Sequence, residues 1–283
     1  MESDWNTRDT AEEVAAMRAM APIAIKASEI LGVDAELRPV WKEFFDNLPP
    51  LPAGALPAEY YDMVTVANED GQEFKRLKEE CARRPVDART RLHVLSREAV
   101  AAANLGLAEH VRYMIPGQVR TIPEEGCDTW GASGPDFGIL RNRLGLREGP
   151  GCLECQRLGN VANALHAALL QTAPQSPGGG DSIMRVCPAW PRNWDAQFTL
   201  AARGAFLVSA SIEKGRIEFV QIRARVGGRC CLLNPWPGET IARYRNGVKA
   251  DELSGKVVTF SSARGETIIV LPRGAVPRKR RVQ

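Results

Sequence analysis

The sequence predicts an α+β protein of more than one domain, in which helical hairpins precede an antiparallel β-sandwich. Apolar residues recur at three- and four-residue steps through most of the first half, which is the period of a helix, and alternate at every second position from about Phe206, which is the period of a strand. Between the two lies Ser176-Pro177-Gly178-Gly179-Gly180, a composition typical of a linker. We therefore expect a helical part over 1–175, a β-sandwich over 181–275 and a basic tail over 276–283.

The first helical hairpin is expected from two amphipathic segments. Thr10 and Glu13 have the spacing of a capping box, which starts a helix, and Gly32 stands where a glycine ends one. Small or apolar side chains lie between them on one narrow face, at Val14, Met17, Ala21, Ala24, Ser28 and Leu31. Asp34 should cap a second helix, with Pro39 near its first turn and an apolar side formed by Leu37, Trp41, Phe44, Phe45 and Leu48. The short connection predicts antiparallel packing.

Further helices are predicted after a proline-rich break at 49–54. Residues 58–87 are ambiguous, with a short strand at 61–67 and a polar helix at 71–84 as possibilities. A second hairpin should join a helix that begins at Asp87 to a partner over 107–119, with its turn at Asn104-Leu105-Gly106. A long loop is expected over 121–151, and a helix over 157–172 should bury Leu158, Val161, Ala162, Leu165 and Leu169.

The β-region is predicted from short alternating segments separated by turn residues. A hairpin should pair 206–211 with 217–223 across Glu213-Lys214-Gly215. Shorter strands are expected at 230–233, 241–245, 256–261 and 267–271, with turns at Asn246-Gly247, Ser254-Gly255 and Arg264-Gly265. No helical crossover would fit between neighbouring strands, so an antiparallel sandwich is favoured over a parallel sheet.

Composition argues against several classes of protein. The chain has 283 residues, 44% hydrophobic and 25% charged, and should fold around a substantial core. No apolar run approaches the roughly 18 to 20 residues that cross a bilayer, so no membrane partner is expected. A net charge of +3, spread along the chain, gives no reason to expect a nucleic-acid partner. The N-terminus has no secretory leader, and the site of action stays open.

No metal and no cofactor are expected. The seven cysteines lie mostly in apolar runs and should be reduced and packed. Cys152 and Cys155 have the spacing of half a zinc site, but a structural zinc needs a second pair, and the adjacent Cys230 and Cys231 should point to opposite faces of a strand. No phosphate loop, dinucleotide fingerprint or Gly-x-Ser-x-Gly elbow occurs.

Two segments resemble the C-terminal end of family 95 glycoside hydrolases, the α-L-fucosidase-like enzymes. The first is Arg185-Val186-Cys187-Pro188-Ala189-Trp190-Pro191 followed by Asp195, and the second is Arg203-Gly204 with Phe206-Leu207-Val208. The resemblance extends over 150–273 and, more loosely, over the hairpin before Leu51. It implies that the helical part is a portion of a six-hairpin (α/α) toroid and that a C-terminal β-sandwich follows. The two segments would then have a structural role where toroid and sandwich join.

The resemblance also implies hydrolysis of a terminal glycosidic bond with inversion, by a water that attacks the anomeric carbon. In the family, the aspartate of an Asp-Gly-Asn motif helps to activate that water, at the start of a helix that ends in a Leu-Leu-Gln-Ser-like sequence. Here the helix ends Leu169-Leu170-Gln171-Thr172, but the Asp-Gly-Asn motif is absent from its start. Glu154 is the nearest acidic side chain and is the predicted catalytic residue.

Substrate-binding residues are expected in the loop before Glu154. The candidates are Asp128, Trp130, Arg141 and Asn142, because an indole face stacks on sugar C–H groups while the polar side chains bind hydroxyls. Simple solvation of this loop is the alternative. Trp190, Trp194 and Trp236 could form a stacking platform for sugars, but their nearness to prolines suits packing between the two domains better.

The predicted partners are a carbohydrate substrate and an N-terminal part of the same enzyme, which would hold the family's general acid. Little or no activity is therefore expected of this chain alone. The alternative, from another class, is a non-catalytic glycan-binding or assembly module. An exposed apolar face on the helix that begins at Thr10 would indicate that a helical partner is missing.

Overall fold

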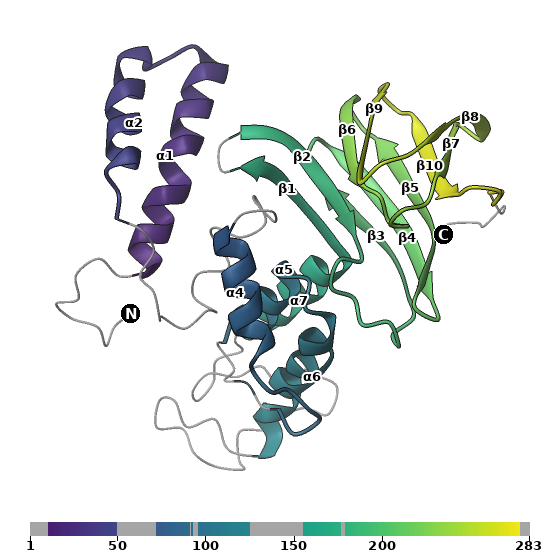
Figure 1. Cartoon of the computed structure of the whole chain (residues 1–283), viewed down its shortest axis with the longest axis horizontal. Helices are drawn as coiled ribbons and strands as arrows, with labels where there is room; N and C mark the ends of the chain where they lie inside the picture. Colours follow the sequence, from purple (N-terminus) through teal and green to yellow (C-terminus); the bar gives the residue numbers. More distant parts are fainter. Residues whose placement is uncertain are drawn as a thin grey trace. The chain divides into compact units, whose positions relative to one another are not determined.

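The structure is a computed structural model that describes residues 11–49, 72–90, 92, 96–124, 155–176 and 179–277. Helices come first along the chain and strands follow from Leu170, so the predicted α+β class is confirmed (Figure 1). The chain divides into two compact units, Met1–Leu165 with Pro174–Gly180 and His166–Ala173 with Asp181–Gln283. None of the helices in these ranges is long and apolar enough to span a membrane. The helices are α1 (Ala11–Leu31), η1 (Ala35–Leu37), α2 (Arg38–Asp46), α4 (Gln72–Ala82), α5 (Glu98–Asn104), α6 (Ala108–Glu124) and α7 (Cys155–Leu169).

The first hairpin packs α1 against α2, as the sequence predicts. α1 buries Val14, Ala21 and Ser28 at seven-residue intervals. Gly32 has a φ of 68°, and the Val33 N–H donates to the Ser28 carbonyl at 3.2 Å. This is the hydrogen bond of a glycine-terminated helix, so the predicted end of α1 is confirmed.

The predicted cap at Asp34 is wrong. Asp34 has a φ of 51°, its side chain makes no capping hydrogen bond, and the chain passes through η1 before α2 begins at Arg38. Pro39 therefore lies in the first turn of α2, where the backbone needs no donor. Arg38 then ties the two helices together, because its guanidinium donates to the Ser28 hydroxyl at 2.8 Å and to the Ser28 carbonyl at 3.0 Å.

The second hairpin joins α5 to α6 at the predicted turn. Gly106 has a φ of 72°, and the Leu107 N–H donates to the Ala102 carbonyl at 2.9 Å. The polar helix expected at 71–84 is α4. Its Leu77 is buried in a small cluster with residues of the α5–α6 hairpin, namely Ala101, Leu105 and Leu107.

The predicted start of a helix at Asp87 is wrong, and a strand considered earlier in the chain lies outside the described residues. The helix predicted to begin at Asp87 begins only at Glu98, because residues 87–90 form a turn in which the Asp87 carboxylate accepts a hydrogen bond from the Arg89 N–H at 2.7 Å. The strand considered at 61–67 lies outside the described residues.

The last helix is shorter than predicted, and the expected linker is part of a sheet. α7 ends at Leu169, and β1 and β2 follow where the helix end and the linker were predicted. The two strands pair with each other, and this pairing overrides the glycine-rich composition. The buried face of α7 is formed by Val161, Ala164 and Ala168, whereas Ala162, predicted to be buried, is exposed.

The strands form two sheets, with the orders β1-β2-β6-β9 and β3-β4-β5-β10-β7-β8. Every neighbouring pair of the six-stranded sheet is antiparallel, as predicted. β2 and β6 run parallel, contrary to the predicted antiparallel pairing. Between them the chain forms β3, β4 and β5 of the other sheet, and these strands take the place of a helical crossover. The strands are β1 (Leu170–Ser176), β2 (Gly179–Val186), β3 (Ala196–Ala202), β4 (Phe206–Glu213), β5 (Arg216–Ala224), β6 (Gly228–Leu233), β7 (Ile241–Arg245), β8 (Val248–Leu253), β9 (Val257–Ser262) and β10 (Thr267–Pro272).

The main core lies between the two sheets, which makes the β-region a sandwich. Met184 and Leu232 of the four-stranded sheet pack with inward side chains of the other sheet such as Val208, Ile222 and Val270. Alternate residues of β5, β7 and β10 form a second, smaller apolar cluster on the opposite face of the six-stranded sheet. Its members are Phe219, Ala242, Tyr244, Ile269, Leu271 and, beyond β10, Ala275.

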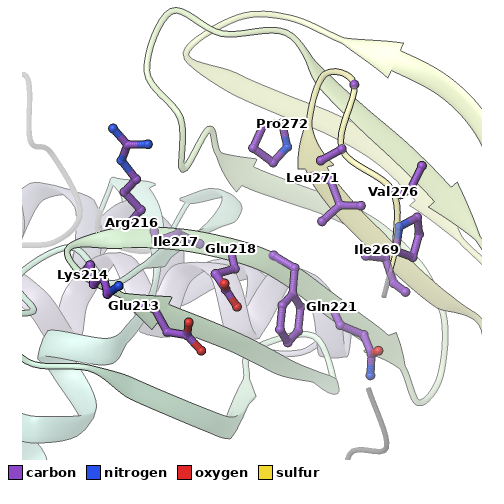
Figure 2. Close-up of a pocket in the computed structure, with 14 residues that line it drawn as sticks. Glu213, Lys214, Arg216, Ile217, Glu218, Gln221, Ile269, Leu271, Pro272 and Val276 are labelled. Atoms are coloured by element: carbon purple, nitrogen blue, oxygen red, sulfur yellow. The ribbon is translucent and has the colours of Figure 1, made fainter. Parts of the chain in front are cut away.

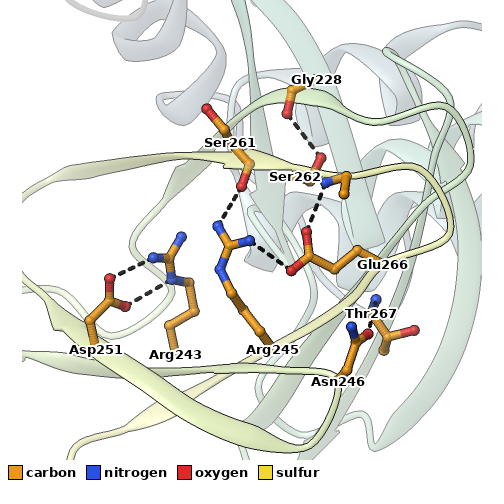
Figure 3. Close-up of polar contacts among 10 residues, drawn as sticks. Gly228, Arg243, Arg245, Asn246, Asp251, Ser261, Ser262, Glu266 and Thr267 are labelled. Atoms are coloured by element: carbon orange, nitrogen blue, oxygen red, sulfur yellow. Dashed lines mark hydrogen bonds and ion pairs between the residues drawn. The ribbon is translucent and has the colours of Figure 1, made fainter.

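Two arginines of β7 reach the four-stranded sheet, Arg243 through the Phe260 ring and Arg245 by donating to the Ser261 carbonyl (Figure 3). Arg243 lies over the Phe260 ring, 4.9 Å from its centroid, and pairs with Asp251 through contacts of 2.8 and 2.5 Å. Arg245 pairs with the buried Glu266 at 2.7 Å. These buried charges are therefore held by partners of opposite sign, as burial of a charge requires.

Candidate functional site

A pocket of about 780 Å³ lies on the outer face of the six-stranded sheet, over β5 and β10 (Figure 2). Its apolar floor is formed by alternate residues of the strands, because successive side chains of a strand point to opposite faces of the sheet. Ile268 and Val270 point into the main core, whereas Ile269 and Leu271 belong to the outer cluster together with Phe219. All three outer residues line the pocket.

A β-bulge supplies one acidic residue of the pocket. Ser211 faces Phe219 across the β4–β5 pair, but Ile212 faces Ile217, so Glu218 is the extra residue of the bulge. Figure 2 shows the side chains of Glu213, Glu218 and Gln221 on the same side of this hairpin. The bulge therefore brings Glu218 to the same pocket as Glu213.

Two short segments form the walls, and each is fixed by a side chain from elsewhere. The β4–β5 turn at Lys214 and Gly215 is held by Asp195, whose carboxylate accepts the Lys214 N–H at 2.7 Å. The segment after β10 is held by Tyr244, whose hydroxyl donates to the Ala275 carbonyl at 3.2 Å. Both walls are thus tied to the sandwich.

The charged residues of the pocket balance formally. Glu213 and Glu218 contribute two carboxylates, and Lys214 and Arg216 contribute two cations. The Gln221 amide adds a neutral donor and acceptor. The pocket therefore combines an apolar floor with hydrogen-bonding groups of both kinds and no excess of either charge.

The structure does not place the site residues predicted from the sequence. Glu154, Asp128, Trp130, Arg141 and Asn142 all lie outside the described residues. Sequence reasoning in turn missed the pocket. The sequence of β10 contains one indication of this pocket. Its Ile-Ile-Val-Leu run places apolar side chains on both faces of the sheet, which predicts that other parts of the protein or a ligand cover each face.

The three tryptophans predicted to pack make contacts within the β-region. The Trp190 and Trp194 rings meet edge to face at 5.3 Å, and the Trp190 indole N–H donates to the Trp194 carbonyl at 2.8 Å. The Trp236 indole donates to the Ile217 carbonyl at 2.9 Å and packs against the main core. These two indole N–H groups are used inside the protein, which supports a structural role.

The described residues hold no group of histidine, cysteine and carboxylate side chains that could bind a metal. Cys230 lies in the main core, and the Thr259 hydroxyl contacts the sulfur of the neighbouring Cys231 from the other side of the strand. Burial raises the pKa of the Cys187 and Cys230 thiols to about 12, so both are protonated at neutral pH. These thiols are packed rather than reactive.

No protein-family model matches the sequence, and no curated protein matches it. Among solved structures, a GH127 β-L-arabinofuranosidase from Geobacillus stearothermophilus T6 aligns at 10% identity and a TM-score of 0.27, over 70% of this chain and 39% of that one. A 4-O-α-L-rhamnosyl-β-D-glucuronidase from Fusarium oxysporum 12S aligns at 10% identity and a TM-score of 0.19, over 42% and 30% of the two chains. A protein described as a glycoside hydrolase aligns at 11% identity and a TM-score of 0.26, over 62% and 29%. The chain thus spans well under half the length of each, and these TM-scores do not assign it to their folds.

Proposed function

We propose that this chain is the C-terminal part of a glycoside hydrolase-like protein that cleaves a terminal glycosidic bond with inversion. The support is the residue-level resemblance of 150–273 to family 95, together with helical hairpins that precede a β-sandwich. We further propose that the specificity is fucosidase-like and that the helical part belongs to a six-hairpin toroid.

The observation that carries the proposal is the exposed apolar surface of the first hairpin. α2 buries no residue, and eight large apolar side chains of the hairpin are between 40% and 74% exposed. Four follow one face of α1 and four lie along the segment from Val33 through α2, so they form two stripes rather than scattered positions. They are Met20, Ile23, Ile30, Leu31, Val33, Leu37, Val40 and Phe44.

A surface of this kind is costly to leave in water and usually marks an interface. In a ring of helical hairpins, each hairpin is covered by its neighbours. We therefore infer that further helical hairpins of the same protein cover these two stripes. Replacing Ile23 and Val40 by lysine should lower binding of a hydrophobic dye to this chain, whereas Val248→Lys, at a residue of β8 that is 71% exposed, should not. Equal dye binding by the wild type and all these variants would argue against an apolar docking surface on the first hairpin.

In the proposed reaction, a water attacks the anomeric carbon while the glycosidic oxygen leaves with a proton from a general acid outside this chain. Glu154 accepts the proton that the water loses. Asp128, Trp130, Arg141 and Asn142 hold the sugar by stacking and hydrogen bonds. All five assignments rest on the sequence.

Turnover by the complete gene product tests the catalytic part of the proposal. Glu154→Gln should lower kcat on the aryl glycoside that is cleaved by about a hundredfold or more, since the amide cannot accept the proton. Glu239→Gln, an exposed position of the β-region, should leave kcat unchanged. Unchanged turnover in Glu154→Gln removes that residue from the proposal, and no turnover of any glycoside in a broad panel removes the enzyme.

The alternative is a non-catalytic glycan-binding or assembly module, in which the exposed hairpin would dock on another protein. The genomic sequence upstream separates the two. A reading frame that continues into further helical hairpins favours the enzyme, whereas an upstream stop codon and a true start at Met1 favour the module.

A further inference from the structure

We propose that the pocket over β5 and β10 binds a neutral saccharide. None of the five residues proposed for hydrolysis is among its lining residues, which begin at Glu213. Its volume of about 780 Å³ falls within the roughly 300–1,000 Å³ of small-molecule sites. The β-sandwich then has a binding role of its own.

The apolar half of the pocket suits the C–H surface of a sugar ring. Phe219, Ile269 and Leu271 form a floor, and Ala242 and Tyr244 of the neighbouring strand β7 pack beside it on the same face of the sheet. Pro272, Val276 and Pro277 add an apolar rim beside it. A pyranose or furanose places its C–H groups on one face, and an aromatic ring is the side chain that best contacts such a face.

The polar half suits hydroxyl groups. Each sugar hydroxyl both donates and accepts, and the pocket offers donors on Lys214 and Arg216, acceptors on Glu213 and Glu218, and both on Gln221. Three of these side chains lie on the same side of the β4–β5 hairpin in Figure 2. A purely apolar ligand would form no hydrogen bonds with these side chains.

The balance of charge indicates a neutral ligand. The lining residues include two carboxylates and two cations, so they have no formal excess of charge that would favour an ion of either sign. A charged ligand of either sign would meet two like charges, an anion at Glu213 and Glu218 and a cation at Lys214 and Arg216, which disfavours both.

The pocket is held in shape before a ligand arrives. Asp195 fixes the turn that carries Lys214, and Tyr244 fixes the segment that carries Val276. The Arg273 N–H also donates to the Thr240 carbonyl at 3.0 Å and closes the same segment onto the sheet. A preformed site loses less conformational freedom on binding, which favours even a small ligand.

Calorimetric titration of the whole chain with neutral saccharides tests the proposal. The probes are glucose-, galactose-, xylose-, arabinose- and fucose-containing di- and trisaccharides, with a galacturonate disaccharide and a short apolar peptide as competitors. At least one neutral saccharide should bind, and Gln221→Ala and Phe219→Ala should each weaken it by roughly tenfold or more. Val248→Ala, a matched truncation of an exposed strand residue, should bind as the wild type does.

Thermal unfolding of each variant shows whether a loss of binding comes from the pocket or from a loss of the fold. Gln221 lies outside both apolar clusters, so Gln221→Ala should stay folded even where Phe219→Ala does not. No binding by any neutral saccharide, equal binding by wild type and Gln221→Ala, or tighter binding of the galacturonate or the peptide would each overturn the inference. Turnover by Glu154→Gln is independent of every one of these results, so failure here is distinguishable from failure of the proposed enzyme.

Discussion

The Asp195 carboxylate accepts a hydrogen bond from the backbone N–H of Lys214 at 2.7 Å, across 19 residues of sequence. Lys214 and Gly215 form the two-residue turn between β4 and β5, and their φ values are 50° and 73°. Positive φ at both positions is what a tight hairpin needs, but it is unfavourable for lysine. Asp195 therefore stabilises a strained turn, and this gives the family-like segment a structural role at the edge of the pocket.

Removing this acceptor should destabilise the β-region. Asp195→Ala leaves the Lys214 N–H to water and frees the turn, and we expect a loss of about 1 kcal/mol in the free energy of unfolding. Asp195→Asn keeps an acceptor oxygen and should lose less. Urea denaturation measures both. Equal stability of Asp195→Ala and the wild type would show that the turn does not need this bond.

Two glycines with similar backbone geometry should respond differently to alanine. Gly227 and Gly247 have φ values of 84° and 88°, so alanine costs roughly 1–2 kcal/mol of strain at either position. At Gly247 the added Cβ meets nothing within 4 Å. At Gly227 it would lie 2.9 Å from the backbone of Ser262 and Arg264, which has to move.

Gly227→Ala should therefore lower the free energy of unfolding by at least about 1 kcal/mol more than Gly247→Ala does. Thermal or urea unfolding of the two variants gives the difference directly. If both lose the same amount, the loop between β9 and β10 yields freely, and the close approach at Gly227 does not constrain it.

Much of the β-region could be predicted because its signals are local. The Asn246-Gly247 turn has positive φ at both residues, and an Asn-Gly pair is the sequence typical of that turn geometry. β4, β5 and β10 alternate inward and outward residues as their patterns indicate. In the helical part, the glycines that end α1 and α5 were equally local signals.

The parts of the fold that the sequence does not predict depend on contacts between residues that lie far apart in the chain. β8 has only exposed and half-buried residues and so no apolar period to detect; its pairing with β7 is what makes it a strand. The parallel contact of β2 with β6 joins residues separated by three strands of the other sheet. The pocket needs the bulge at Glu218 and the segment beyond β10 together, and neither is visible as a motif in the sequence.

The pairing of Arg243 with Asp251 predicts an asymmetric response to mutation. The Arg243 side chain is 9% exposed, and its Nη1 has no hydrogen-bond partner among the residues described here (Figure 3). Asp251→Asn leaves this buried guanidinium without its counter-charge and should cost about 2 kcal/mol. Arg243→Met removes the charge and keeps an apolar side chain on Phe260, so it should cost less than about 1 kcal/mol.

Urea unfolding of both single variants and of the double variant tests this asymmetry. The double variant should be more stable than Asp251→Asn alone, because the arginine that lacks its partner is then gone. A larger loss for Arg243→Met than for Asp251→Asn would contradict it, and would mean that the stacking on Phe260 outweighs the ion pair.

The buried thiols predict a loss of stability at high pH. Burial raises the pKa of Cys187 and Cys230 from 9.0 to about 12, and the neighbouring Cys231 adds a smaller rise at Cys230. Between these values the unfolded chain loses protons that the folded chain keeps, so the folded state binds more protons and its stability falls as pH rises. Below pH 9 the contribution is fully present, and each thiol adds a slope of about 1.4 kcal/mol per pH unit inside the window.

Comparison with the Cys187→Ala/Cys230→Ala double variant isolates this effect from lysines and tyrosines, which titrate in both proteins. Urea unfolding at several pH values between 8 and 11 should give a steeper fall for the wild type than for the double variant. At pH 8, a thiol reagent should label Cys187 and Cys230 only after unfolding, as peptide mass mapping would detect, since the thiolate is the reactive form. Equal slopes, or fast labelling of Cys230 in the folded protein, would mean that water reaches these sulfurs and that burial does not control their titration.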